Sequence, residues 1–175
     1  MNVLIINGNL DKKTGTLQDY LDKFTERRRE LGDEIKQITL AGKEIQPCIG
    51  CYTCWLKTPG ICCLKDDHEE IIKSAVWSDQ TIWTSSLSMG FVLSSLKNAS
   101  DRMLPLVHPF LKMKGDRMSH YPRYEKTIDN ILLLEANQDL DESTFNIIAD
   151  IYRRYKFVGK TDKNPEVVAN EAHNI

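Results

Sequence analysis

The stretch Val3-Leu4-Ile5-Ile6-Asn7-Gly8, close to the first residue, decides the fold class of this chain. Four consecutive aliphatic side chains are typical of a strand that is buried on both faces, as in a parallel sheet. Asn-Gly is a turn dipeptide, so the strand ends there. Apolar residues then recur at helical spacing, at Leu17, Tyr20, Leu21 and Phe24. Strand, turn and amphipathic helix together form the first part of a βαβ unit.

The same alternation continues along the rest of the chain. Short apolar runs predict further strands at 34–40, 81–84, 131–134 and 157–158. Amphipathic stretches predict helices that begin at Asp66-Asp67 and near Val92, and a last helix that begins after the acidic residues 139–142. Five strands alternating with four helices predict an α/β fold, a doubly wound five-stranded parallel sheet with helices on both faces.

Loops at one edge of this sheet are the expected binding site. Ligands of doubly wound sheets bind beyond the carboxyl ends of the strands, where the strand order reverses. We therefore expect the loops 8–16, 84–90 and 135–140 to converge on one crevice.

Length and composition restrict the domain organisation and the partners. The chain has 175 residues, 41% of them hydrophobic and 27% charged, which fits one domain over 1–159 followed by a polar, loosely held C-terminal tail over 160–175. The net charge of −2 gives no reason to expect nucleic acid or a membrane as a partner. Five cysteines within 48–63 do not resemble a secreted disulfide framework. We therefore expect a cytoplasmic protein.

The segment 104–127 is rich in proline and histidine and predicts no regular element. Long irregular segments inside a compact domain tend to be functional, so we expect a lid or a contact in a homodimer or higher homo-oligomer. Its histidines, such as His108 and His120, are more simply explained by packing or surface positions than by catalysis, because no nucleophile or paired carboxylate is recognisable beside them.

The loop 7–16 has the parts that a phosphate group needs. It leads into a helix N-terminus, where unpaired N–H groups and the helix dipole favour an anion. Gly8 and Gly15 allow the backbone to approach a ligand closely, and Thr14 and Thr16 supply hydroxyl donors. Neither a Walker sequence nor a G-x-G-x-x-G fingerprint is present. The loop therefore predicts a mononucleotide rather than ATP or tightly bound NAD.

Several motifs, in this order, resemble one known family. They are Asn7-Gly8, Gly15-Thr16, Cys48-Ile-Gly50-Cys51, Cys54-Trp55, Pro59-Gly60, Cys62, Asp66-Asp67, Leu96-Lys97 and Asp101-Arg102. The chain resembles the NADPH-dependent FMN reductase and iron–sulfur flavoprotein group of the flavodoxin superfamily over roughly its first 150 residues. The resemblance implies a flavodoxin-like fold that binds FMN, with the phosphate at the first loop and the flavin ring against the loop after the third strand. The positions implied to bind FMN are Asn9, Leu10, Asp11, Thr14, Gly15 and Thr16 in the first loop, and Ser85, Ser86, Leu87, Ser88, Met89 and Gly90 in the other.

The cysteine block resembles the cluster-binding run of an iron–sulfur flavoprotein. Closely spaced thiolates on one loop can hold a [4Fe–4S] cluster, and the predicted ligands are Cys48, Cys51, Cys54 and Cys62, with Cys63 as a spare. A metal-free loop packed beside the flavin, a zinc site and a reactive thiol pair near the flavin are the alternatives.

The first functional hypothesis is an FMN-dependent NAD(P)H oxidoreductase that passes hydride or electrons to a small acceptor. The cofactor carries such chemistry, so no catalytic side chains are expected. The second is an iron–sulfur flavoprotein that carries electrons between redox proteins. The third is a binding module that has the fold without the cofactor.

Overall fold

Strand β1 (Asn2–Asn7) lies inside the sheet, as its apolar run predicts. The structure, a computed structural model, describes residues 1–9, 16–136 and 140–175. In it, β1 pairs in parallel with β2 (Glu34–Thr39) on one side and with β3 (Gln80–Ser85) on the other. Strands β8 (Asp129–Leu134) and β9 (Phe157–Lys160) complete a parallel sheet of order β2-β1-β3-β8-β9. This is the flavodoxin strand order, and it confirms the predicted fold class.

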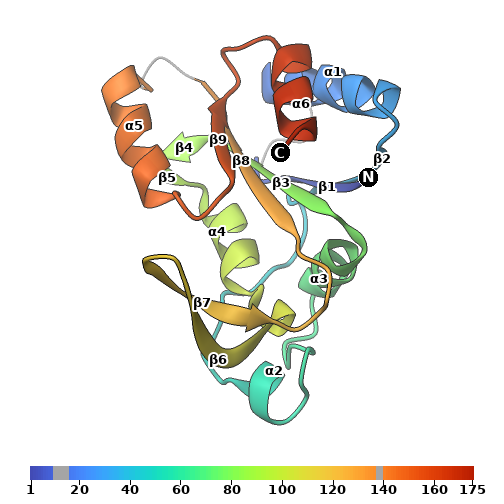
Figure 1. The fold of residues 1–175 in the computed structure, drawn as a ribbon, viewed down its shortest axis with the longest axis vertical. Helices are drawn as coiled ribbons and strands as arrows, with labels where there is room; N and C mark the ends of the chain where they lie inside the picture. Colours follow the sequence, from blue (N-terminus) through green and yellow to red (C-terminus); the bar gives the residue numbers. More distant parts are fainter. Residues whose placement is uncertain (10–15, 137–139) are drawn as a thin grey trace.

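Helices cover both faces of this sheet (Figure 1). Helices α1 (Thr16–Glu30) and α6 (Pro165–His173) pack on one face. Helices α3 (His68–Trp77), α4 (Ser94–Asp101) and α5 (Glu142–Ile151) pack on the other. Within the described ranges, no helix has both the length and the apolar character needed to cross a membrane.

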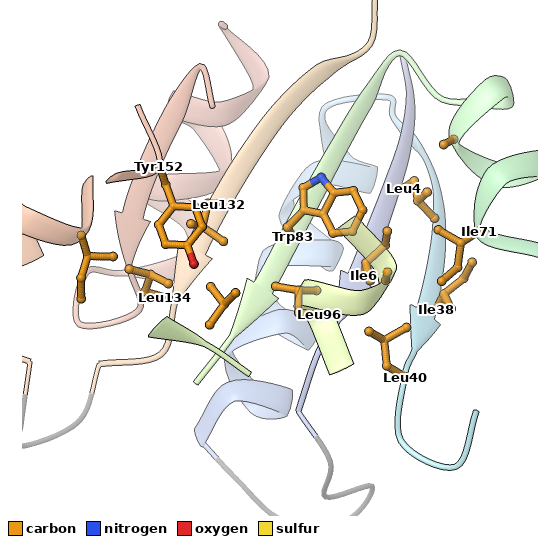
Figure 2. Close-up of a cluster of buried hydrophobic side chains, with 14 of the residues drawn as sticks. Leu4, Ile6, Ile38, Leu40, Ile71, Trp83, Leu96, Leu132, Leu134 and Tyr152 are labelled. Atoms are coloured by element: carbon orange, nitrogen blue, oxygen red, sulfur yellow. The ribbon is translucent and has the colours of Figure 1, made fainter. Parts of the chain in front are cut away.

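Successive residues of β1 serve two separate cores. Leu4 and Ile6 pack toward α3 and α4, beside Trp83 of β3 (Figure 2). Val3 and Ile5 face α1 and α6. These four side chains are fully buried, which explains why residues 3–6 are apolar at every position rather than at alternate ones.

The segment 104–127 is more regular than predicted. A 3-10 turn, η1 (Leu104–Leu106), leads into an antiparallel hairpin of β6 (Val107–Lys114) and β7 (Arg117–Pro122). The hairpin forms its own two-stranded sheet below the main one (Figure 1). Its prolines lie within or at the end of these strands, positions that a strand at a sheet edge tolerates.

The C-terminal segment is also more ordered than predicted, and the expectation of a loosely held tail is wrong for it. Helix α6 begins behind the N-cap Asn164, whose side chain accepts a hydrogen bond from the backbone of Glu166. Val168, Ala169 and Ala172 are fully buried against α1. The buried face consists of small residues, so it carries a weak hydrophobic signal in the sequence.

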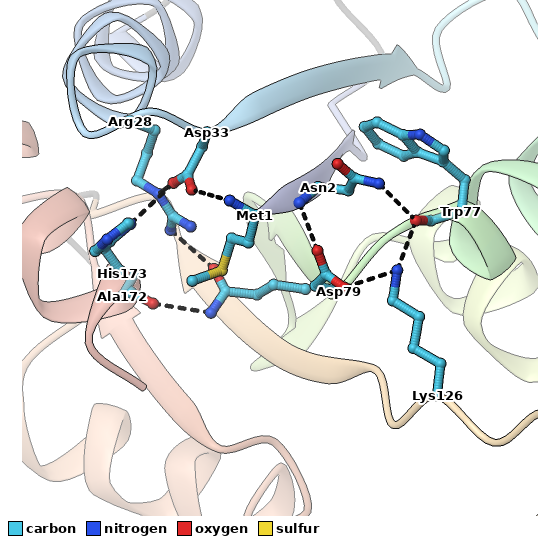
Figure 3. Close-up of polar contacts among 10 residues, drawn as sticks. Met1, Asn2, Arg28, Asp33, Trp77, Asp79, Lys126, Ala172 and His173 are labelled. Carbon is cyan, nitrogen blue, oxygen red and sulfur yellow. Dashed lines mark hydrogen bonds and ion pairs between the residues drawn. The ribbon is translucent and has the colours of Figure 1, made fainter.

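A buried polar network fixes α6 to the rest of the fold (Figure 3). The fully buried side chains of Arg28 and Asp33 form an ion pair, with Nε and Oδ2 2.5 Å apart. Arg28 also donates to Gln80, and Gln80 donates to the carbonyl of Ala172, each over 2.8 Å. Nδ1 of His173 lies 3.1 Å from the Asp33 carboxylate and must donate to it, because a carboxylate only accepts.

The Asp33 carboxylate is kept charged by its partners. Burial alone would raise its pKa, but hydrogen bonds from the Met1 nitrogen, Arg28 and His173 hold the pKa below its usual value. A charged Asp33 at neutral pH is what balances the charge of Arg28 inside the protein.

Candidate functional site

Three loops converge at the carboxyl edge of the sheet, as predicted. The backbone N–H of Ser86 donates to Oδ1 of Asn9 over 2.9 Å, and the Ser86 hydroxyl lies 2.8 Å from the same oxygen. The Asn9 amide donates to the carboxylate of Glu135 over 3.1 Å, and the Ser86 hydroxyl contacts that carboxylate as well. Glu135 is not among the predicted site residues; its place directly after the strand 131–134 is the signal that could have identified it. We call these three residues the crevice triad.

Gly8 has a role in the packing of the fold. Its N–H donates to the carbonyl of Thr84 over 2.8 Å, and Ser95 of α4 donates to the Gly8 carbonyl over 2.8 Å. A Cβ at this position would lie 2.9 Å from both Cβ of Leu96 and the Thr84 carbonyl. The missing side chain therefore makes room for α4 against the strand.

Part of the predicted phosphate loop lies outside the described residues, namely Leu10, Asp11, Thr14 and Gly15. Thr16 is the first residue of α1, a helix of 15 residues. The N-terminus of α1 therefore follows this loop directly, which is the arrangement that favours an anion.

The loop after β3 forms a tight hairpin. Strands β4 (Leu87–Ser88) and β5 (Phe91–Val92) are joined by Met89 and Gly90, which both have positive φ angles, 52° and 78°. This is the conformation of a two-residue hairpin turn. Met89 is 95% exposed, so it makes little contact with the rest of this chain.

Ser85, another predicted FMN position, is used by the fold itself. Its hydroxyl accepts a hydrogen bond over 3.0 Å from the backbone of Leu93, the residue that precedes α4. The side chain therefore fixes the start of α4 instead of presenting its oxygen to the crevice.

The cysteines gather around one small cavity of about 20 Å³. All five thiols line it: Cys48, Cys51, Cys54, Cys62 and Cys63. Helix α2 (Thr53–Leu56) lies within this loop, preceded by Gly50 and Tyr52 in left-handed conformations, φ 65° and 54°. The loop thus folds back on itself and brings Cys51 close to Cys63.

The thiols differ in environment. The Sγ atoms of Cys51 and Cys63 are 3.3 Å apart. Hydrogen bonding to Thr53, with a further contribution from Cys63, lowers the pKa of Cys51 to about 7. The contact with Cys51 raises the pKa of Cys63, and burial raises that of Cys54. A thiolate at Cys51 beside a thiol at Cys63 is therefore the favoured arrangement near neutral pH.

A buried guanidinium supports the cysteine loop. Arg102, at the C-terminal end of α4, donates to Asp66 over 2.5 Å and to the carbonyl of Gln46 over 3.1 Å. Its second nitrogen lies 3.4 Å from Sγ of Cys62. Arg102 and Asp66 occur in the motifs that the sequence shares with the family, but sequence reasoning does not place them at the thiols. The contact between Arg102 and Cys62 forms because the C-terminal end of α4 lies against the cysteine loop.

The donor chemistry of the loop suits an iron–sulfur cluster. Thiolates are the ligands that such clusters prefer. Among the described residues, no three His, Cys, Asp or Glu side chains are arranged to hold a metal ion. Cys63 is not among the four predicted ligands, so its contact with Cys51 does not test the arrangement of that set.

The thiols and the crevice triad lie at opposite ends of α4. The N-terminal end of this helix contacts Gly8 through Ser95, and its C-terminal end contacts Cys62 through Arg102. Helix α4 therefore lies between these two groups of residues.

Comparison with known proteins supports the fold and identifies the family. An iron-sulfur flavoprotein of Archaeoglobus fulgidus is 34% identical over 104 residues, which make up 59% of this chain and 46% of that protein. One from Methanocaldococcus jannaschii is 43% identical over 77 residues, 44% of this chain and 39% of that protein. The chain thus matches less than half the length of these curated relatives.

Among solved structures, an NAD(P)H:quinone oxidoreductase from Methanothermobacter marburgensis superposes with a TM-score of 0.68 and 16% identity, covering 99% of this chain and 96% of that one. At this identity the likeness concerns the fold. The family model described as NADPH-dependent FMN reductase matches residues 1–116, which include the loop after β1, the cysteine loop and the loop after β3. This chain belongs to the NADPH-dependent FMN reductase family.

Proposed function

We propose that this protein is an FMN-dependent NAD(P)H oxidoreductase that passes hydride or electrons to a small acceptor molecule. The observation that carries the proposal is the crevice triad, which joins the loops after β1, β3 and β8 at the carboxyl edge of the sheet. This edge is where doubly wound sheets bind their ligands, and the family model includes two of the three loops.

The residues present fit FMN when its two ends are considered separately. The Glu135 carboxylate repels a phosphate dianion, whereas the N-terminus of α1 attracts one. We therefore assign the phosphate to the α1 end of the crevice and the uncharged part of FMN to Asn9, Ser86 and the β4–β5 hairpin. When bound, FMN supplies hydride and electron transfer. The contribution of the chain is to hold and orient it.

Fluorescence titration with FMN tests this proposal. We expect saturable quenching of flavin fluorescence, and weaker binding of riboflavin because it lacks the phosphate. Absence of binding at about 100 μM free FMN, where a complex worth roughly 5.5 kcal/mol is half formed, would contradict the proposal and favour the cofactor-free binding module. The FMN-loaded protein should oxidise NADH or NADPH, and the rate with each identifies the preferred donor.

A matched pair of serine variants makes the test specific. Ser86→Ala removes the hydroxyl that contacts both Asn9 and Glu135. A neutral hydrogen bond contributes about 0.5–1.5 kcal/mol, so we expect FMN affinity to fall by about 2- to 12-fold. Ser100→Ala removes a hydroxyl that bonds only the Lys97 carbonyl on the surface of α4, and should leave the affinity unchanged. Equal affinities of the two variants would place FMN away from Ser86.

A second candidate function is electron transfer through a [4Fe–4S] cluster held by Cys48, Cys51, Cys54 and Cys62. The observation that favours it is the gathering of all five thiols around one cavity beside the Arg102 guanidinium. Protein prepared without air should then contain nearly four irons per chain, and each single Cys→Ser change in the set should remove most of them. Cys63→Ser should retain the iron. Iron-free anaerobic protein, with cluster assembly verified on a control protein, would exclude this function.

We also propose a cytoplasmic location and a homo-oligomer, with a small molecule or a redox protein as electron acceptor. Five free cysteines, several of them exposed, suit a reducing compartment. The exposed apolar side chains of the β6–β7 hairpin support the contact between copies.

A further inference from the structure

The contact between Cys51 and Cys63 has no role in the proposed function. Cys63 is outside the predicted ligand set, yet its Sγ lies 3.3 Å from that of Cys51. A disulfide requires about 2.05 Å, so the two sulfurs need to approach by only about 1.3 Å. Both residues are exposed, so a small reagent can reach them.

We propose that Cys51 and Cys63 form a dithiol site that reacts with low-molecular-weight disulfides, such as oxidised glutathione, and closes to an intramolecular disulfide. The proposal does not rest on FMN binding or on the oxidoreductase activity.

The reaction takes two steps. The thiolate of one cysteine attacks a sulfur of the reagent, forming a mixed disulfide and releasing one reagent thiolate. The second cysteine loses its proton to solvent and attacks the protein sulfur of the mixed disulfide, releasing the other reagent thiolate. In total, the two protein thiols lose two electrons, and one molecule of reagent disulfide is reduced to two thiols.

The environments of Cys54 and Cys62 favour this pair. Cys54 is 8% exposed, which protects its thiol from a reagent in solution. Cys62 is held by Arg102, 3.4 Å from its sulfur. Cys62 and Cys63 are neighbours in the chain, and a ring closed between adjacent residues departs from ordinary disulfide geometry. Within the contact pair, the second step is intramolecular and therefore outcompetes attack by further reagent.

The disulfide and the cluster exclude one another, because Cys51 is common to both. A sulfur in a disulfide has no thiolate to offer to iron. Low-molecular-weight disulfides would thus decide whether the loop can accept a cluster, and Cys63 becomes the residue that protects Cys51 while no cluster is bound.

Thiol counting and peptide mapping test the proposal. The metal-free chain of 175 residues, treated with oxidised glutathione, should fall from five free thiols to three and carry no glutathione. Trypsin cuts after Lys57 and Lys65, so a bond between Cys51 and Cys63 joins the peptides 44–57 and 58–65 under non-reducing conditions. Persistence of five thiols, or stable glutathione adducts on the wild type, would overturn the proposal.

Single variants identify the pair. Cys51→Ser and Cys63→Ser should each abolish the joined peptides and retain glutathione on the remaining partner. Cys48→Ser and Cys62→Ser are the matched controls and should still lose two thiols. Loss of the joined peptides in a control variant, with retention in Cys63→Ser, would assign the bond to other cysteines and overturn the proposal.

Discussion

Arg102 shows how a single residue can organise a loop that has little core of its own. Its guanidinium is almost fully buried, and so is the carboxylate of Asp66 with which it pairs. Burial would raise the pKa of Asp66, but hydrogen bonds from Arg102 and from the backbone of Gln46 and His68 hold it below its usual value. The charge of Asp66 is therefore needed to balance Arg102.

Removing the charge of Asp66 should lower the free energy of unfolding. Asp66→Asn keeps the shape of the side chain but leaves the buried guanidinium without its counter-charge, so we expect a loss of about 3–5 kcal/mol in the free energy of unfolding at pH 7. Asp67→Asn is the matched control; Asp67 is exposed and accepts a hydrogen bond from the backbone of Glu44, so a loss of at most about 1 kcal/mol is expected. Urea unfolding of both variants measures the difference.

The stability lost on Asp66→Asn should depend on pH, and the lowered pKa of Asp66 determines the direction of this dependence. Because the folded pKa of Asp66 is lowered, its contribution to stability is complete above the unfolded value of about 3.9 and is lost as the pH falls through the lower folded pKa. The gap between wild type and Asp66→Asn should therefore narrow below about pH 4. Equal losses in the two asparagine variants, or a gap that widens in acid, would refute the role assigned to this pair.

At the scale of elements, the sequence predicts the segments with a strong apolar pattern and misses those whose buried residues are few or small. Residues 3–6 of β1 and 131–134 of β8 are all apolar, because both faces of these strands are covered. The sequence does not predict helix α6, because the side chains on its buried face, Val168 and two alanines, are small. The dipeptide Asn164-Pro165, an N-cap followed by proline at the first helical position, is the signal that could have revealed it. The sequence does not predict the β6–β7 hairpin, because neither of its two faces is fully buried.

Two adjacent valines test the docking of α6. Val168→Ala removes two methyl groups from a fully buried position against α1, so we expect a loss of about 2 kcal/mol in stability. Val167 is 49% exposed, and Val167→Ala should stay within about 0.5 kcal/mol of the wild type. Thermal or urea denaturation distinguishes the two. A similar small effect of both changes would mean that α6 does not pack against α1 in solution.

At the scale of the whole molecule, the β6–β7 hairpin is the clearest uncovered apolar surface. Met113 and Met118 face each other across its strands and are 64% and 72% exposed. Leu111, two residues from Met113 on the same face, is also exposed. An apolar cluster of this kind on a separate hairpin is typical of a contact with another protein surface.

Sedimentation velocity tests whether that surface joins two copies of the chain. We expect the wild type to sediment as a dimer at micromolar concentrations, and a variant carrying Met113→Glu and Met118→Glu to sediment as a monomer with unchanged circular dichroism. Ile147→Glu places the same charge on an exposed apolar position of α5 and should remain dimeric. A monomeric wild type, or dissociation by Ile147→Glu alone, would rule out this surface.

The position of α4 between the two candidate sites has a consequence for electron movement. This helix has eight residues, which at 1.5 Å per residue gives a length of about 12 Å. Its first turn is hydrogen-bonded to the loop that carries Asn9, and the residue at its other end contacts the sulfur of Cys62. Leu96 and Ala99, on the side of the helix that faces the sheet, are buried. If a flavin were held in the crevice and a metal at the thiols, the two would lie at opposite ends of this one short helix, and the bonded chain of α4 would connect them within a single chain.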